Sequence, residues 1–248
     1  MASTNYSSGP NMAGGLAVGI SHSTNYVGFS GIVGFAVQAG DSTSPVISNF
    51  KIDGRTVVNG DYIKKDATLT ATVTDETALS LTTSSIEVDG VGITFNSLSG
   101  TSSYDATTGL LTYRLNITAD GNHTITIKAM DISGNSSTLS RTTKIDTGEL
   151  KALSVYVYPN PYRGIGNMAI GYQLNKNADT AIYIFNAIGR LIFKRTYISG
   201  AEGAHIGYNE ITWDAKDDFG NLLSNDVYFL RVVSDGKPVG RTKIAVIK

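Results

Sequence analysis

The sequence predicts an all-β protein in which two tandem β-sandwiches follow an N-terminal glycine-rich β segment. Short alternating apolar runs, bounded by Gly, Asn, Asp and Ser, recur roughly every 8–15 residues, as expected for sandwich strands. The 248 residues suit two domains of about 100 residues each. Helical periodicity is almost absent, and residues 75–81 form the one weak helix candidate.

The N-terminal segment, residues 1–43, contains the repeat Ser-Thr-Asn-Tyr at positions 3–6 and 23–26. A period-two run follows the second copy and places large apolar residues on one face of a strand. Such a strand needs a β partner in water, although a flexible Gly/Ser linker is the open alternative. The residues predicted to interact are Val27, Phe29, Val33, Phe35 and Val37.

The second segment, residues 44–148, opens at Ser44-Pro45 and carries seven predicted strands separated by Asp-Gly and Asn-Gly turns. Five of its motifs resemble those of a bacterial immunoglobulin-like surface domain: Ser44–Ile47, Ala71–Asp75, Ile86–Gly90, Asp120–Ala129 and Asp131–Asn135. The resemblance implies a sandwich fold and an extracellular context. The predicted strands are 46–52, 67–73, 84–89, 92–95, 110–117, 123–130 and 137–145.

The third segment, residues 149–248, has strands predicted at 154–158, 168–174, 180–186, 191–198, 208–213, 226–233 and 241–247. Its motifs include Tyr158-Pro-Asn-Pro-Tyr162, Asn209-Glu-Ile-Thr-Trp213 and Val227-Tyr-Phe-Leu-Arg231. These resemble the family of flagellar hook-capping immunoglobulin-like domains and type IX secretion sorting domains. The resemblance implies an address read by outer-membrane secretion machinery. The long loop at 199–207 departs from the family pattern.

Composition narrows the classes of function. A net charge of −1, with scattered Lys and Arg, gives no field that would attract nucleic acid. The absence of cysteine excludes disulfides, thiol catalysis and zinc–thiolate sites. No apolar run is long enough to span a bilayer, and residues 1–11 show no signal-peptide pattern.

Chemistry-bearing clusters are sparse. His22, His123 and His205 fall in three different segments and are expected on the surface or in loops, with Glu202 near His205 as the closest approach to an acid–base pair. No cofactor is expected except calcium, which oxygen ligands in two Asp-rich turns would suit. The open alternative is that these residues only form turns. The calcium candidates are Asp131, Asn135, Asp214, Asp217 and Asp218.

We therefore expect a non-enzymatic structural or adhesive protein, extracellular or at the cell surface. It would self-associate through residues 1–43, as a filament subunit, and meet secretion machinery through residues 149–248. One alternative is the non-catalytic C-terminal portion of a secreted hydrolase. Another is a carbohydrate-binding module, which would cluster Tyr104, Tyr162 and Tyr208 on one sheet face. Trp213 is expected to be structural because it lies in a strand beside Ile211.

Overall fold

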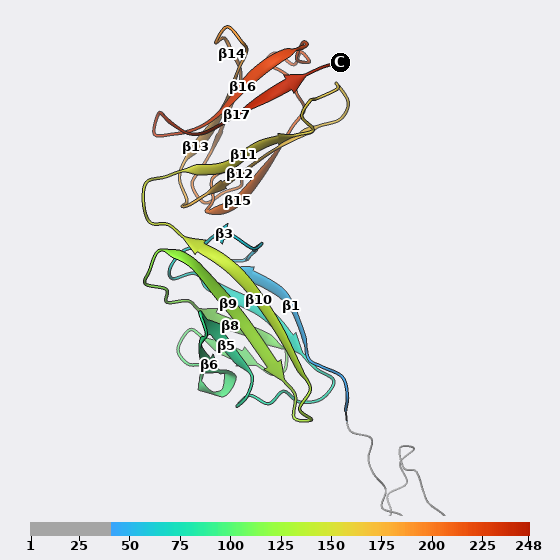
Figure 1. Cartoon of the computed structure of the whole chain (residues 1–248), viewed down its shortest axis with the longest axis vertical. Coiled ribbons are helices and arrows are strands. Elements are labelled where there is room, and N and C mark those ends of the chain that lie inside the picture. The colour runs from blue at the N-terminus through green and yellow to red at the C-terminus, as the bar shows by residue number, and fades with distance from the viewer. Residues whose placement is uncertain (1–40) are drawn as a thin grey trace, which may run out of the picture. The chain divides into compact units, whose positions relative to one another are not determined.

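The computed structural model describes residues 41–248 (Figure 1). The predicted interaction residues, from Val27 to Val37, lie outside the described residues, so their role stays a prediction. The predicted all-β fold is confirmed, because residues 41–248 contain seventeen strands and, as their one helical element, the short 3-10 turn η1 (Phe95–Ser97). No helix within this range is long and apolar enough to cross a membrane.

The N-terminal sandwich is built from two five-stranded sheets. The order of the first sheet is β2-β1-β4-β8-β7 and that of the second is β3-β10-β9-β5-β6. The first sheet contains β1 (Val46–Ile52), β2 (Arg55–Thr56), β4 (Thr68–Thr74), β7 (Ser103–Asp105) and β8 (Leu110–Arg114). The second contains β3 (Asp61–Tyr62), β5 (Ser85–Val88), β6 (Val91–Thr94), β9 (Gly121–Met130) and β10 (Ser136–Ile145).

Alternation along the central strands explains this core. In β4 the buried residues are Leu69, Ala71 and Val73, and the threonines between them face outward. In β9, Ile125 and Ile127 are likewise fully buried. Because side chains alternate between the faces of a strand, each sheet presents one apolar face to the other.

The C-terminal sandwich pairs a three-stranded sheet, β11-β12-β15, with a four-stranded sheet, β14-β13-β16-β17. Its own apolar core includes Ile170, Ile182 and Leu230, each fully buried. The smaller sheet contains β11 (Ala152–Tyr158), β12 (Met168–Leu174) and β15 (Gly207–Trp213). The larger contains β13 (Thr180–Phe185), β14 (Leu191–Tyr197), β16 (Asp226–Ser234) and β17 (Lys237–Val246).

The predicted strands correspond to observed strands, and two match residue for residue, β1 and β12. Strands β2, β3 and β7 were missed because two or three residues are too few to show a period. Residues 75–81, the weak helix candidate, do not form a helix. That stretch makes a single bridge, Leu79 with Asp131, and two of its residues pack onto the core as a loop.

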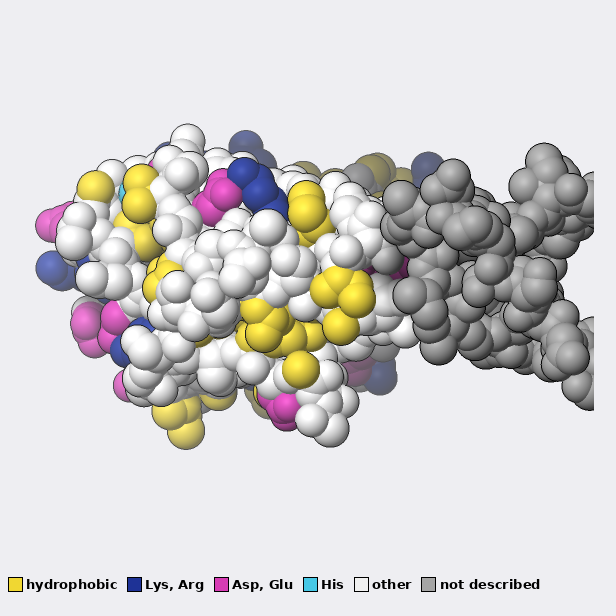
Figure 2. Space-filling model, turned by 90° about the horizontal axis from the view of Figure 1, so that it is seen from below, with side chains coloured by type: hydrophobic (Ala, Val, Ile, Leu, Met, Phe, Trp, Pro, Cys, Tyr) yellow, Lys and Arg dark blue, Asp and Glu magenta, His cyan; other side chains and the backbone are white. Residues whose placement is uncertain are grey.

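The surface seen from below in Figure 2 is formed mainly by backbone and uncharged polar side chains. Hydrophobic side chains appear there as small separate groups, which are common on protein surfaces.

Candidate functional site

One five-residue loop recurs three times, and two of its copies contain residues predicted to bind calcium. It spans residues 131–135, 186–190 and 217–221, with Asp or Asn first and a positive-φ glycine fourth. In each copy the first residue's backbone N–H donates to the fifth carbonyl, at 2.9–3.0 Å. The first side chain accepts the fifth backbone N–H, at 2.8–2.9 Å. These side chains therefore shape tight hairpin loops.

The carboxylates of Asp131 and Asp217 both accept hydrogen bonds from within their own loops. Asp131 Oδ2 also accepts the Asn135 side-chain N–H at 2.7 Å, and Asp217 Oδ2 accepts that of Asn221 at 3.1 Å. The Asn221 backbone N–H lowers the pKa of Asp217 from its usual value. Nearby, Asp214 pairs with Lys216 at 3.2 Å.

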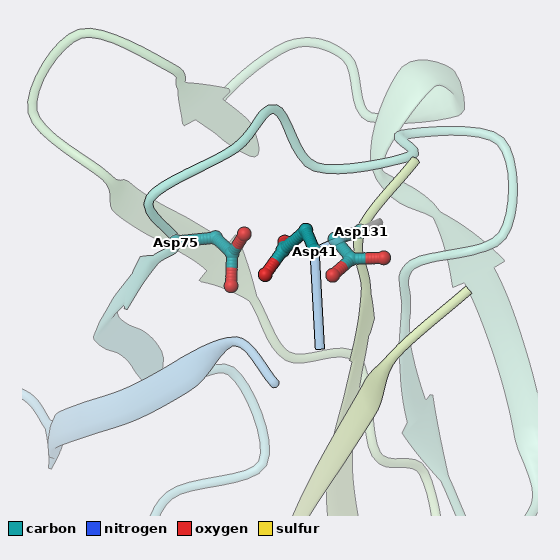
Figure 3. A group of neighbouring side chains, drawn as sticks. All are labelled: Asp41, Asp75 and Asp131. Carbon is teal, nitrogen blue, oxygen red and sulfur yellow. The ribbon is translucent and has the colours of Figure 1, made fainter. Parts of the chain in front are cut away.

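Asp131 nevertheless has acidic neighbours. Asp41, Asp75 and Asp131 each place a carboxylate oxygen within 4.8 Å of the other two (Figure 3). Asp75 Oδ1 accepts two hydrogen bonds from Thr77, at 2.9 and 2.7 Å. Its Oδ2 atom is buried and accepts none within residues 41–248. Sequence reasoning missed Asp41 and Asp75, and the calcium prediction at Asp131 stays a prediction.

His123 corrects an expectation, because it is buried rather than at the surface or in a loop. It lies in β9 on the same face as Ile125 and Ile127, a parity already visible in the sequence. Its Nδ1 atom lies 2.7 Å from Asp89 Oδ2. The Thr124 backbone N–H and then His123 lower the pKa of Asp89. The pair joins β9 to the turn after β5 and serves the fold.

His205 is half-buried beside a joint between the two sandwiches, and His22 lies outside the described residues. The His205 Nδ1 atom lies 2.8 Å from the Ile206 carbonyl oxygen. Burial lowers the pKa of the His205 imidazole. Arg55 donates to the same carbonyl at 3.3 Å. The buried Asp61 carboxylate also lies here, and burial raises its pKa. A cavity of about 30 Å³ at this joint is too small for a substrate.

The three tyrosines proposed for carbohydrate binding do not form one cluster. Tyr162 is 1% exposed, so it cannot belong to an exposed aromatic cluster. It is buried because its backbone pairs with the last strand and its hydroxyl donates to the Gly166 carbonyl at 2.8 Å. Tyr104 belongs to the other sandwich, stacked on Phe95 at 5.1 Å.

Tyr208 alone of the three takes part in an outward-facing aromatic group. Its hydroxyl lies 2.6 Å from the Tyr156 hydroxyl and donates to Glu210. Partial burial, followed by the neighbouring Glu210, raises the pKa of Tyr208. The ring of Tyr156 covers Gly171, so this group covers the sheet β11-β12-β15.

Trp213 is structural, as predicted. It is buried against Phe193, with ring centroids 5.3 Å apart, and its indole N–H donates to the Lys216 carbonyl at 3.1 Å.

No protein-family model matches this sequence, and no curated protein matches it. Among solved structures, the dimeric latent PorU of Porphyromonas gingivalis is 21% identical, with a TM-score of 0.38. The match covers 84% of this chain and 20% of PorU. PorZ, a surface component of the type IX secretion system of the same organism, is 24% identical, with a TM-score of 0.30. That match covers 50% of this chain and 15% of PorZ.

The fibronectin(III)-like modules of CbhA from Clostridium thermocellum are 15% identical, with a TM-score of 0.33. The match covers 80% of this chain and 93% of those modules. The chain thus spans about a fifth or less of PorU and PorZ. TM-scores this low establish no common function.

Proposed function

We propose that this chain is a non-catalytic structural part of a secreted or cell-surface protein, in which the two sandwiches form a stiff spacer. The observation that carries the proposal is the connection at residues 146–151, which is hydrogen-bonded to both sandwiches. A free linker would let the sandwiches move independently, whereas a bonded one transmits force and fixes spacing.

On the N-terminal side, the Thr147 backbone N–H and hydroxyl both donate to Asp120 Oδ2, at 2.9 and 2.8 Å. The Thr147 N–H and then Lys65, which lies 3.0 Å from Asp120, lower the pKa of Asp120 to about 2. The carboxylate is therefore charged at every physiological pH and holds the start of the connection.

On the C-terminal side, the buried Asn175 holds the end of the connection. Its Oδ1 atom accepts the Lys151 backbone N–H, and its Nδ2 atom donates to the Glu149 carbonyl, both at 2.8 Å. Lys176 donates to the Gly148 carbonyl as well. Because Asn175 is 1% exposed, water cannot readily replace these bonds.

The described histidines support a non-catalytic role. His123 is paired with Asp89, and His205 is directed to a backbone carbonyl beside a cavity too small for a substrate. A general base needs a reachable proton in an open site, and neither histidine has one.

The stiffness is tested with Asn175→Ala, because alanine can make neither bond to the connection. We expect small-angle scattering to show a broader distribution of distances, with both sandwiches still folded by circular dichroism. Asn221→Ala, at an exposed loop, is the matched control. An unchanged distribution for N175A would reject the stiff spacer.

Self-association through residues 1–43 is the second part of the proposal. An apolar strand face there would pair with a neighbouring copy, with main-chain hydrogen bonds for affinity and Phe29, Val33 and Phe35 filling a groove. Such a head-to-tail contact propagates into a filament. Deleting residues 1–40 should leave folded monomers and abolish assembly in electron micrographs. Polymers that persist in the deletion would reject this part.

Residues 149–248 are proposed to act as a secretion or anchoring module, on the strength of the motif resemblance. In a bacterium with a type IX system, a reporter fused before residue 149 should appear at the surface. Retention of that fusion inside the cell, with the sandwich folded, would reject the role.

A further inference from the structure

The outer face of the sheet β14-β13-β16-β17 gathers basic residues that are scattered in the sequence. Its outward positions on the four strands hold four basic and three aromatic side chains, and none holds an acidic one. We call this surface the basic–aromatic face. It comprises Tyr183, Phe185, Lys194, Phe229, Arg231, Arg241 and Lys243.

Arg231 and Arg241 lie directly opposite each other across the β16–β17 pair. Like charges in that position destabilise a sheet. Neither arginine, nor Lys194 nor Lys243, takes part in any ion pair found within residues 41–248. The face therefore carries a concentrated positive charge that costs stability, and a bound anion would offset that cost.

Aromatic rings lie among these cations. The Lys194 ammonium lies 5.2 Å from the centre of the Tyr183 ring, and the Arg231 guanidinium 5.4 Å from that of Phe185. The Tyr183 and Phe185 rings stack on each other, 6.1 Å apart and 6° from parallel. The cation–π contacts hold the charged groups against a flat apolar surface.

The face is hollowed as well as charged. An open groove of about 1040 Å³ is lined by Phe229, Arg231, Arg241 and Lys243. A second hollow of about 330 Å³ shares Phe229 and Arg231 with it. Phe229 is 38% exposed, and the Lys243 ammonium lies 5.8 Å from the centre of its ring. A ligand there would meet an apolar ring and guanidinium groups together.

We propose that the basic–aromatic face binds an acidic polysaccharide. Arg231 and Arg241 would bind one carboxylate or sulfate of the polymer through paired N–H donors, as guanidinium groups do. Phe229 would stack on the apolar face of a neighbouring sugar ring, and Lys243 and Lys194 would meet further anions along the chain.

This ligand fits better than an acidic peptide or a nucleic acid. The inner strands β13 and β16 already pair their backbones on both sides, so no peptide strand can be added where Phe229 and Arg231 lie. Single-stranded nucleic acids are bound by stacking successive bases on several exposed aromatic rings, whereas of the three aromatic residues of this face only Phe229 is exposed and Tyr183 and Phe185 are half-buried. A polymer of charged rings matches both the arginines and the stacked aromatics.

The test is a calorimetric titration of the full chain with polygalacturonate at about 0.15 M salt. Neutral dextran, poly-glutamate and single-stranded DNA serve as comparison polymers. The double variant Arg231→Gln with Arg241→Gln should weaken polygalacturonate binding roughly tenfold or more. Phe229→Ala should weaken it several-fold without changing the salt dependence, since it removes stacking and no charge.

Arg141→Gln is the matched control, because Arg141 also lies over an aromatic ring, Phe50 at 5.9 Å, on the other sandwich. It should bind like the wild type. Circular dichroism and thermal unfolding establish that the variants fold, and removing one arginine of the opposed pair should not lower the melting temperature. No binding of polygalacturonate, tighter binding of poly-glutamate or DNA, or equal weakening by R141Q would each overturn the proposal.

Discussion

Gly207 lies so close to Asp61 that a Cβ atom built on the glycine would stand 3.1 Å from the Asp61 Oδ1 atom. The same Cβ would stand 3.1 Å from the Tyr62 carbonyl oxygen, and Gly207 has φ +86°. The first residue of β15 thus meets β3, and the two sandwiches contact each other through backbone.

Gly207→Ala should destabilise this contact by more than the backbone strain alone. Alanine at positive φ costs about 1 kcal/mol or more, and the added methyl group pushes β3 away. Gly236→Ala is the control, because Gly236 also has positive φ, +72°, but open space around its Cβ position. Thermal unfolding should show the larger loss for G207A. Equal losses of stability in G207A and G236A would mean that the contact between β15 and β3 does not stabilise the protein.

Asp61→Asn should stabilise the protein increasingly as pH rises. Burial raises the Asp61 pKa above 3.8, so the folded state binds the proton more tightly than the unfolded state, and the charged form costs stability at higher pH. Asparagine removes that cost. The Asp61 environment also includes His205 and Arg55, which both variants keep.

The measurement is urea unfolding of wild type and D61N between about pH 4 and pH 7. The stability difference between D61N and wild type should shift in favour of D61N across that range. Asp235→Asn, in an exposed turn, should show no such trend. A difference that is constant with pH, or that moves the other way, would contradict the burial argument.

Asp131→Ala should cost more stability than Asp217→Ala although both residues open the same type of loop. Asp131 is 1% exposed and its three accepted hydrogen bonds are lost from a buried site, for about 2–3 kcal/mol. Asp217 is only partly buried, and water replaces part of what its loop loses. Chemical unfolding measures both.

The same two variants also distinguish two roles of the Asp131 carboxylate, which are shaping the loop and binding a calcium ion. If Asp131 acts only through its loop, adding calcium leaves the loss caused by D131A unchanged. A loss that grows with calcium would assign the carboxylate to an ion, together with Asp75, and would reject the purely structural interpretation.

Tyr156 and Gly171 should behave as one unit. A Cβ atom at Gly171 would stand 2.4 Å from the Tyr156 ring, so Gly171→Ala displaces the ring and costs about 1 kcal/mol or more. Once Tyr156→Ala has removed the ring, the second substitution should cost little. A double-mutant cycle by thermal unfolding checks this coupling. Additive losses would show that the ring does not depend on the glycine.

The sequence could predict those features that depend on residues close together in the chain, namely single strands, their buried faces and their turns. The alternation Leu69, Ala71, Val73 identifies both β4 and its buried face, and the turn chemistry of Asp131 and Gly134 identifies a hairpin loop. The buried position of His123 follows from its parity with Ile125 in β9, whereas its residue type alone predicts a surface position.

The sequence could not predict features that depend on the register between paired strands or on contacts between distant segments of the chain. Arg231 and Arg241 lie opposite each other only because of where the β16–β17 turn places them. Arg55 bonds the Ile206 carbonyl from 151 residues away, through strands too short to show a period. The basic–aromatic face and the joint therefore emerge only from the fold.

Amide hydrogen exchange over residues 1–40, measured in assembled material, tests the proposed self-association most directly. If this segment pairs with a neighbouring copy, amides around Phe29, Val33 and Phe35 should be protected in the assembly and should exchange rapidly in dissociated chains. Rapid exchange throughout residues 1–40 in the assembled state would contradict it.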